Sequence, residues 1–146
     1  MPHYQKILTF RAPSPGLHDI TSDIARWVSS QDITIGLLSL FIRHTSASLT
    51  IQENADPDVL RDLEEFMARL APEDTALYRH ESEGPDDMPA HIRSALTDTQ
   101  LSIPVADNRM LLGTWQAIYL FEHRRHPGER QIVLHLAGDY RNGDDD

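Results

Sequence analysis

The sequence contains no cysteine among its 146 residues. Disulfide bonds, thiolate metal sites and cysteine nucleophiles are therefore excluded. Any bound metal ion must take its ligands from histidine, aspartate, glutamate, the backbone or water. A packed core without disulfide bonds is feasible, because a chain of this length buries roughly 70% of the surface that it exposes when unfolded.

The sequence also lacks a long apolar run. No stretch approaches the ~20 residues that a membrane-spanning helix needs. The first ten residues, MPHYQKILTF, do not combine a basic segment with a long apolar one, as a signal peptide does. From these two observations we expect a cytoplasmic protein with no membrane partner.

Positive charge is scarce, and the formal net charge is −10. Between Glu53 and Asp87 stand twelve acidic residues against three arginines and no lysine. Such a surface repels phosphate backbones, so the sequence predicts no nucleic-acid partner. For most of these acids the simplest interpretation is a solvated helix face.

The first half of the chain predicts strands interrupted by one helix. Apolar residues at Ile20, Ile24, Trp27 and Val28 recur at helical spacing. A nearly continuous apolar run, by contrast, is typical of a buried strand. The predicted elements are a strand over 4–11, a helix from Leu17 or Asp19 to Ser29, a strand over 33–42, and a short strand of the same sheet over 48–52.

The second half predicts two helices and then strands only. Asp56-Pro57-Asp58 places an N-cap acid before a proline at the first helical position, so a helix should run from there to about residue 70. A shorter helix should begin near Asp86 or Asp87. The predicted strands cover 101–105, 109–112, 116–123 and 131–137.

These elements favour an α+β fold class over a doubly wound fold, because strands and helices do not alternate one by one. We expect a mostly antiparallel sheet packed with two to three helices in a single compact domain. No repeat or linker divides the chain. The predicted domain covers residues 1–139, and residues 140–146 form an acidic tail.

The segment His80–His91, HESEGPDDMPAH, holds two histidines and four carboxylates around a Gly-Pro turn. Asp87 and His91 are four residues apart and would share one helix face. His80 can fold back across the turn, and three such ligands with one open position are the pattern of a catalytic zinc site. The alternative is that Asp86 or Asp87 only caps the helix and both histidines lie on the surface.

A second cluster, RHTSAS, covers Arg43–Ser48 and follows the apolar run at 33–42. Its hydroxyl groups and backbone N–H groups at a strand end could hold an anion, with positive charge from Arg43. The same side chains could instead cap a turn. A serine nucleophile is disfavoured, because no G-x-S-x-G elbow is present.

Two further motifs follow strands near the C-terminus. Trp115 and Gln116 lie in a GTWQ segment, where tryptophan is more often a packing residue than a ligand platform. Glu122 and Arg124 would point to the same side of a strand that continues that far. A surface ion pair between them is the simpler alternative to a role in binding.

Four segments together resemble the YjbQ-like family, whose members are called secondary thiamine-phosphate synthases. They are HTSASLTIQENADPDV, YRHESEGPDDMPAHI, LLGTWQAIYLFEHR and QIVLHLAGD, and the likeness covers roughly residues 10–139. The resemblance implies a compact α+β subunit, a homotrimer, and a polar, metal-binding site. It also makes His44 the partner of the later histidine cluster.

The resemblance and the residue chemistry together predict a metal-assisted enzyme acting on a small phosphorylated or anionic metabolite. The metal is divalent, with zinc expected first and magnesium as the alternative. A hydrolase with metal-bound water, a non-catalytic trimeric metal- or metabolite-binding protein, and a purely structural role at subunit contacts remain alternatives. The predicted catalytic residues and metal ligands are His44, His80, Asp87 and His91. The predicted substrate-binding residues are Arg43, Thr45, Ser46, Ser48, Glu83, Trp115, Gln116, Glu122 and Arg124.

Overall fold

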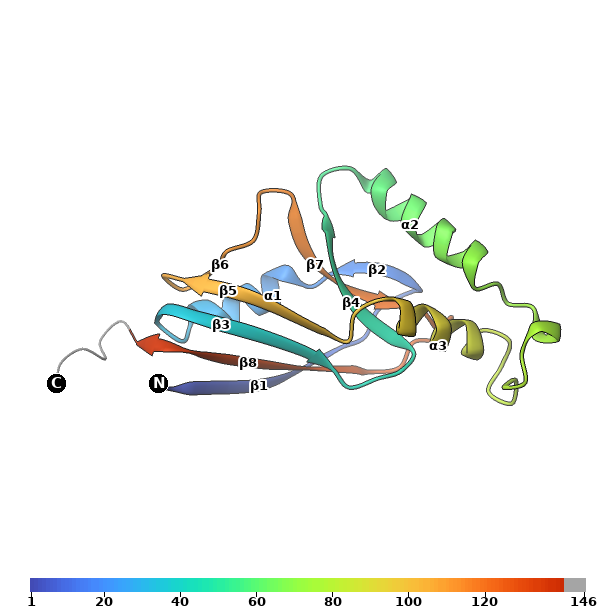
Figure 1. Ribbon diagram of the computed structural model, residues 1–146, viewed down its shortest axis with the longest axis horizontal. Coiled ribbons are helices and arrows are strands. Elements are labelled where there is room, and N and C mark those ends of the chain that lie inside the picture. Colours follow the sequence, from blue (N-terminus) through green and yellow to red (C-terminus); the bar gives the residue numbers. More distant parts are fainter. Residues whose placement is uncertain (141–146) are drawn as a thin grey trace.

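Two antiparallel β-sheets and three α-helices make up the computed structural model, which describes residues 1–140 (Figure 1). The strands are β1 (His3–Phe10), β2 (Gly16–Asp19), β3 (Ile33–Ile42), β4 (Ala47–Glu53), β5 (Gln100–Ala106), β6 (Arg109–Met110), β7 (Gln116–Glu122) and β8 (Arg130–Tyr140). The helices are α1 (Thr21–Ser29), α2 (Pro57–Leu70) and α3 (Asp87–Leu96), with a 3₁₀ turn η1 (Thr75–Leu77). The predicted α+β class is confirmed.

The larger sheet has the strand order β1-β8-β3-β5-β6, and the smaller one has the order β2-β7-β4. The prediction that 48–52 joins the sheet of 33–42 is therefore wrong. β4 pairs with β7 instead, from Ala47 opposite Glu122 to Glu53 opposite Gln116. Hydrogen bonds to β7 satisfy the backbone of β4, and adjacency along the chain does not reveal that distant partner.

The larger sheet buries one face and carries apolar side chains on the other as well. Its inner face packs on α1 and the smaller sheet, with Ile24, Leu38 and Leu134 fully buried. Its outer face leaves Leu37 and Phe41 about half exposed, at alternate positions of the same strand. None of residues 1–140 therefore covers the second face of β3.

The first helix begins later than predicted. Residues 16–19 form β2, which pairs with β7, and α1 starts only at Thr21. Gly16 has φ +112°, a left-handed conformation that favours glycine and starts the strand. Leu17 is buried beside Met67 and Tyr119, so this apolar side chain packs from the strand and not from the helix.

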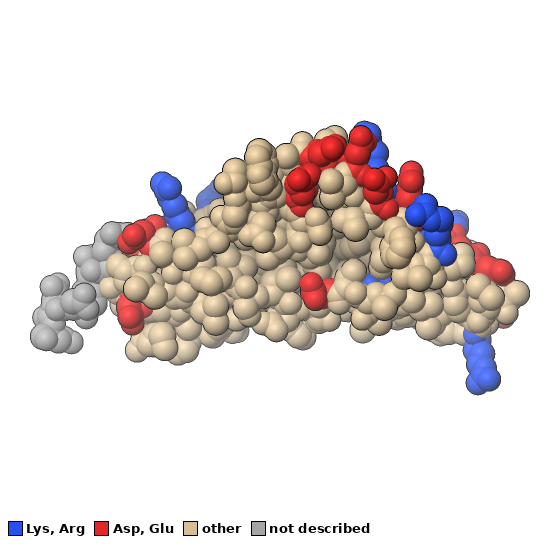
Figure 2. Space-filling model, turned by 45° about the horizontal axis from the view of Figure 1, so that its top comes forward, with Lys and Arg blue, Asp and Glu red and all other residues tan. Residues whose placement is uncertain are grey.

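The second and third helices begin where the sequence predicts. The Asp56 carboxylate accepts from the Asp58 backbone N–H at 2.9 Å, and Pro57 is the first helical residue of α2. α3 begins at Asp87 and packs against β4, where the Ser94 hydroxyl donates to the Ala47 carbonyl. Acidic side chains gather over α2, as Figure 2 shows.

One compact domain holds all twelve of these elements. The predicted boundary at residue 139 falls one residue before the end of β8, and the rest of the predicted tail, 141–146, lies outside the described residues. Among residues 1–140, no helix is long and apolar enough to cross a membrane.

Candidate metal and anion site

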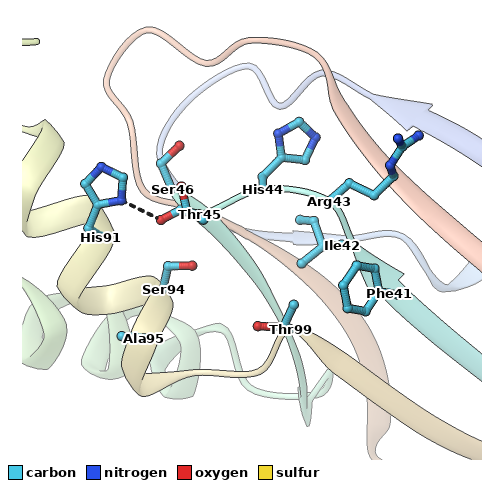
Figure 3. A pocket seen from close by; sticks show the side chains of 10 residues that line it. All are labelled: Phe41, Ile42, Arg43, His44, Thr45, Ser46, His91, Ser94, Ala95 and Thr99. Carbon is cyan, nitrogen blue, oxygen red and sulfur yellow. Dashed lines mark hydrogen bonds between the residues drawn. The ribbon is translucent and has the colours of Figure 1, made fainter.

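A pocket of about 720 Å³ opens where β3 runs into β4, beside residues 91–95 of α3 (Figure 3). We call it the strand-end pocket. Its wall combines the predicted anion-binding segment with one predicted metal ligand. The lining residues are Phe41, Ile42, Arg43, His44, Thr45, Ser46, His91, Ser94, Ala95 and Thr99. The structure therefore brings the two histidine clusters of the sequence to one place.

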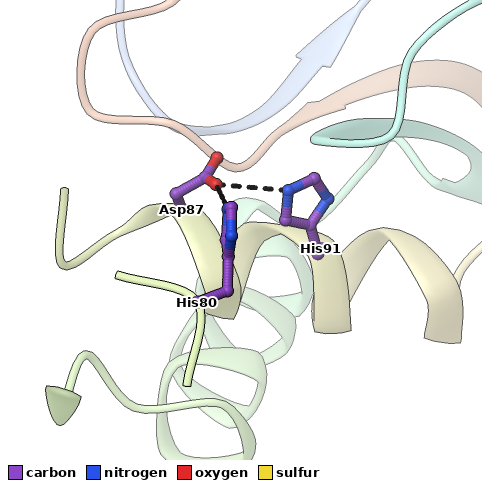
Figure 4. A group of neighbouring side chains, drawn as sticks. All are labelled: His80, Asp87 and His91. Atoms are coloured by element: carbon purple, nitrogen blue, oxygen red, sulfur yellow. Dashed lines mark hydrogen bonds and ion pairs between the residues drawn. The ribbon is translucent and has the colours of Figure 1, made fainter. Parts of the chain in front are cut away.

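A group of three side chains stands at the His91 end of this pocket (Figure 4). One ligand atom from each of His80, Asp87 and His91 lies within 4.8 Å of the other two. Asp87 Oδ2 is 2.5 Å from His80 Nε2 and 3.2 Å from His91 Nε2. We call this group the His–Asp–His cluster.

The turn before α3 brings His80 back to the helix. Gly84 has φ +106°, and its carbonyl accepts from the Asp87 backbone N–H at 3.3 Å. Asp86 occupies the N-cap position but makes no side-chain capping bond. The alternative in which Asp86 or Asp87 serves only as a helix cap is therefore wrong, since both carboxylates bind other side chains.

Arg124 holds both of these carboxylates. Its Nη1 donates to Asp87 Oδ1 at 2.6 Å, and its Nε donates to Asp86 Oδ2 at 3.0 Å. Its Nη2 donates to the Glu83 carbonyl at 2.9 Å. With Oδ1 fixed by the guanidinium, the other oxygen of Asp87 faces the two imidazoles.

Both aspartates are ionised in this environment. Burial alone would raise the pKa of Asp87, but hydrogen bonding from His80 and the charges of His91 and Arg124 lower it below its ordinary value. Burial likewise opposes ionisation of Asp86, while the Arg125 backbone N–H and Arg124 lower its pKa. A charged carboxylate is the form that binds a metal ion.

The hydrogen bond of His91 to the backbone fixes which of its nitrogens carries the proton. Its Nδ1 is 3.0 Å from the Thr45 carbonyl oxygen, which can only accept, so Nδ1–H is the donor. In the neutral ring Nε2 then presents a lone pair toward Asp87 Oδ2. A nitrogen lone pair and an ionised carboxylate oxygen 3.2 Å apart attract each other only when they share a cation. That cation is either a metal ion or a second proton on the imidazole.

The donor set fits a divalent ion of the zinc type. Two imidazole nitrogens and one carboxylate oxygen are the three protein ligands of a common class of catalytic zinc site. The backbone carbonyl that orients His91 and the guanidinium that orients Asp87 are typical outer partners of metal ligands. The fit is poorer for magnesium, which prefers oxygen ligands.

His44 lies in the same pocket but not in the His–Asp–His cluster. Its Nε2 accepts from the Gln131 backbone N–H at 2.8 Å, so that nitrogen is already engaged. Burial lowers the pKa of His44, and the nearby Arg130 charge adds to the effect, which keeps the ring neutral. Arg43, at the same end of the pocket, donates to the Gln131 side chain at 3.0 Å.

The simpler sequence interpretation, a surface ion pair between Glu122 and Arg124, is wrong. It is fully buried and forms a two-bond ion pair with Arg130, at 2.6 and 2.7 Å. Its Oε2 also accepts from the backbone N–H groups of residues 123 and 124. Glu122 therefore holds the backbone of residues 123 and 124 in place, and the Arg124 side chain extends from there toward Asp86 and Asp87.

The remaining predicted substrate contacts lie outside the strand-end pocket. Ser48 is fully buried, with its hydroxyl 2.9 Å from His123 Nε2. Trp115 is well exposed in the β6–β7 loop, and Gln116 accepts there from the Gly113 N–H. Glu83 is exposed beside the turn at Gly84.

Three residues in and around the site carry structural roles that sequence reasoning missed. Asp86 anchors Arg124, Arg130 neutralises Glu122, and His123 is buried behind the site. The signal in the sequence that could have indicated these roles is the EHR triplet at residues 122–124, which ends a strand in a chain with few cations. Its partners could not be read from the sequence, because they come from segments up to 75 residues away.

Comparison with known proteins places the chain in a family. The profile described as UPF0047 protein YjbQ-like matches residues 6–139. The chain is 52% identical to UPF0047 protein sll1880 of Synechocystis, over 93% of this chain and 92% of that protein. It is 47% identical to UPF0047 protein YjbQ of Escherichia coli O157:H7, over 93% and 99%.

Solved structures agree with this assignment. The conserved hypothetical protein TT1486 of Thermus thermophilus matches with a TM-score of 0.77 at 35% identity, covering 88% of this chain and 97% of that one. A YbjQ-like protein of Sulfolobus solfataricus, at 22% identity and a TM-score of 0.85, shares the fold and covers 94% and 99%. The chain therefore belongs to the UPF0047, YjbQ-like family.

Proposed function

We propose that the protein is a metal-assisted enzyme that acts on a small phosphorylated or anionic substrate. One observation carries the proposal: Asp87 Oδ2 lies within 3.2 Å of two imidazole nitrogens, and the backbone hydrogen bond of His91 turns a lone pair toward it. A divalent cation bound by His80, Asp87 and His91 satisfies all three atoms. Zinc is the ion that we expect, with magnesium as the alternative.

The strand-end pocket supplies the substrate side of the proposal. Arg43 and the hydroxyls of Thr45 and Ser46 can bind an anionic group, while Phe41 and Ala95 give the wall an apolar part. The finer expectation, a secondary thiamine-phosphate synthase activity, comes from the family resemblance. A metal ion there would polarise a phosphoryl oxygen or activate a water molecule.

The chain's own residues would orient the metal ligands. Arg124 keeps Asp87 ionised and aimed, and the Thr45 carbonyl keeps His91 in one tautomer. His44 is neutral and stands beside Arg43; because its Nε2 accepts from the Gln131 N–H, its Nδ1 carries the proton and can donate a hydrogen bond to a bound anion. To act as the acid–base group or fourth ligand that the sequence predicts, His44 would have to give up the bond from the Gln131 N–H.

Metal content tests the proposal directly. Elemental analysis of the purified full chain should give near one zinc per chain, and His80→Ala and His91→Ala should each release it. His126→Ala is the matched control, because His126 is exposed and outside the cluster, and it should keep the metal. Metal-free wild-type protein that stays metal-free when zinc is supplied would reject the metal site.

A non-catalytic metal- or metabolite-binding protein is the second candidate. It is favoured by the completeness of the bonds at Asp87, whose two oxygens are both engaged within the chain. Metal-loaded protein that binds phosphorylated metabolites without converting them would support it. Turnover that disappears in His91→Ala would support the enzyme.

We also propose that the protein works as a homotrimer in the cytoplasm. The exposed apolar outer face of the larger sheet, with Ile7, Ile35, Leu37 and Phe41, supports self-association, because patches of this kind mark contact surfaces. Sedimentation should give three times the chain mass. A monomer at micromolar concentration would contradict the trimer, and recovery in the membrane fraction would contradict the location.

A further inference from the structure

A pair of histidines stands on the outer face of the larger sheet. His3 Nδ1 lies 3.1 Å from His135 Nε2, and the two ring centroids are 5.3 Å apart. Neither histidine lines the strand-end pocket or belongs to the His–Asp–His cluster. We call these two side chains the His3–His135 pair. It is a second place where imidazole nitrogens meet, and the proposed function makes no use of it.

The sheet itself sets the spacing of the pair. His3 on β1 stands opposite Ala137 of β8, and Gln5 stands opposite His135, so the two histidines are diagonal neighbours on adjacent strands. β8 lies between β1 and β3 and pairs with both. His3 is exposed, His135 is half-buried, and their contact lies at the surface, where an ion can reach it. The ligand positions are thus set before any ion binds, which lowers the cost of binding.

Gln5 determines which nitrogen of His135 is free. The Oε1 atom of Gln5 is 2.9 Å from His135 Nδ1. An amide oxygen only accepts, so Nδ1–H donates to it, and the neutral ring keeps a lone pair on Nε2. This Nε2 is the atom that faces His3. A hydrogen bond to the second nitrogen of a histidine is the usual way in which a protein orients a metal ligand.

The distance between the facing nitrogens fits a shared ion. Imidazole binds zinc at about 2.0–2.1 Å, which puts two ligand nitrogens about 2.9 Å apart at a right angle and about 3.3 Å apart at a tetrahedral angle. The observed 3.1 Å lies between these two separations. Without an ion, His3 Nδ1–H donates to His135 Nε2. An ion takes the place of this proton when the proton moves to Nε2 of the His3 ring and both rings turn slightly.

The neighbouring positions in the ladder carry no positive charge. The residues directly beside the pair on this face are Gln5 on β1, Ser39 on β3 and Ala137 on β8. Asp139 follows on the same face of β8, because alternate residues of a strand point the same way. The formal net charge of the whole chain is −10. Such a field raises the local concentration of cations.

We propose that the His3–His135 pair is a second metal site, which binds one late first-row divalent ion through two imidazole nitrogens, with water completing the coordination. Imidazole suits copper, nickel and zinc, and the affinity of such a site reaches its maximum at copper(II) in the Irving–Williams order. Copper(II) is therefore the ion that should bind most tightly. Gln5 is a positioning residue, because it acts on the ion through His135.

Copper titration of a chain without the first cluster tests the inference. His80→Ala and His91→Ala together remove two ligands of the His–Asp–His cluster from the untagged full chain. Calorimetric titration of this parent variant with copper(II) chloride at pH 7 should show saturable binding of one ion per chain. Electron paramagnetic resonance of the bound copper(II) should show coupling to two imidazole nitrogens. The result does not depend on the proposed function, since it holds whether or not the first cluster binds zinc.

Two further substitutions in the parent variant remove one ligand each. His3→Ala and His135→Ala should each weaken copper binding at least tenfold and reduce the coupling to one nitrogen. Gln5→Leu keeps both ligands, so it should weaken binding about 10- to 100-fold and leave the coupling to two nitrogens. His126→Ala is the matched control, because His126 is exposed in the loop between β7 and β8, and it should change neither readout.

The absence of saturable copper(II) binding up to millimolar concentration would overturn the proposal. So would an unchanged affinity in a folded His135→Ala chain. Binding that is lost in His3→Ala but kept in His135→Ala would overturn it too, because the ion would then lie on the backbone before His3. Leu37→Glu tests whether a neighbouring chain takes part. Unchanged stoichiometry in that variant supports a pair within one chain, and loss of binding would contradict it.

Discussion

Arg124 Nη1 lies 2.6 Å from Asp87 Oδ1, and this contact turns the other carboxylate oxygen toward the two imidazoles of the His–Asp–His cluster. The guanidinium is itself held by Asp86 through Nε. The bond thus links the end of β7 to the first turn of α3. Arg124 acts on any bound metal through Asp87 and is a positioning residue.

Replacing Arg124 should therefore weaken metal binding without removing a ligand. We expect Arg124→Gln to lower zinc affinity about 10- to 100-fold, the usual effect of losing an outer partner of a ligand. Competition with a chromogenic chelator measures it. Arg125→Gln is the matched control, because its exposed side chain pairs with Glu73 and not with Asp87. Equal loss in both variants would argue against a specific role for Arg124.

The site residues that could be predicted from the sequence are those whose spacing is local. Asp87 and His91 share a helix face because they are four residues apart, and His80 returns across a glycine turn. In the same way the Asp56-Pro57 pair fixed the start of α2. In each case the signal and the structure lie within about twelve residues of each other.

What the sequence did not reveal depends on pairing across long separations. Residues 16–19 looked like part of a helix, because an apolar Leu17 fits a helix as well as a strand. Only the pairing of Leu17 with Phe121 shows that this segment is a strand. Glu122 binds Arg130 rather than Arg124 for another reason: only eight residues separate the pair, but they stand at the ends of β7 and β8, which belong to different sheets, and spacing along the chain does not show that these ends meet. Propensity and periodicity carry no information about such partners.

Breaking the buried pair at the end of β7 should destabilise the whole chain. Glu122→Gln leaves the Arg130 guanidinium buried without a counter-charge, and loss of one partner of a buried pair typically costs about 3–5 kcal/mol. Urea unfolding at pH 7 measures the free energy of unfolding. Glu129→Gln is the control, because Glu129 pairs with Arg11 at the exposed surface, where such a pair contributes about 0–1 kcal/mol. Similar losses in the two variants would contradict a structural role for Glu122.

His123 should make the protein less stable in mild acid. Burial, followed by the charges of Arg93 and Arg130, lowers the pKa of His123 from 6.5 to about 3. Between these values the unfolded chain binds a proton that the folded chain does not, so stability is fully present above pH 6.5 and falls as the pH drops below it. The slope from this residue is at most about 1.4 kcal/mol per pH unit.

Removing the imidazole should flatten that dependence. In His123→Gln the free energy of unfolding should change less between pH 6.5 and pH 4.5 than in the wild type, whatever its value at pH 7. Urea titrations at four pH values in this range measure the slope. His126→Gln should keep the wild-type slope, since His126 is exposed. An unchanged slope in His123→Gln would mean that the ring is not buried in its neutral form.

The outer face of the larger sheet should be a contact between chains, and a charge placed there should separate them. Leu37 is 47% exposed on this face and does not line the strand-end pocket, so Leu37→Glu alters the surface alone. We expect it to shift the sedimenting species from three chains toward one. Leu70→Glu is the matched control, because Leu70 is 52% exposed on α2, away from this sheet. Dissociation in both variants, or in Leu70→Glu only, would place the contact elsewhere, because a charge disrupts association only where the contact excludes water.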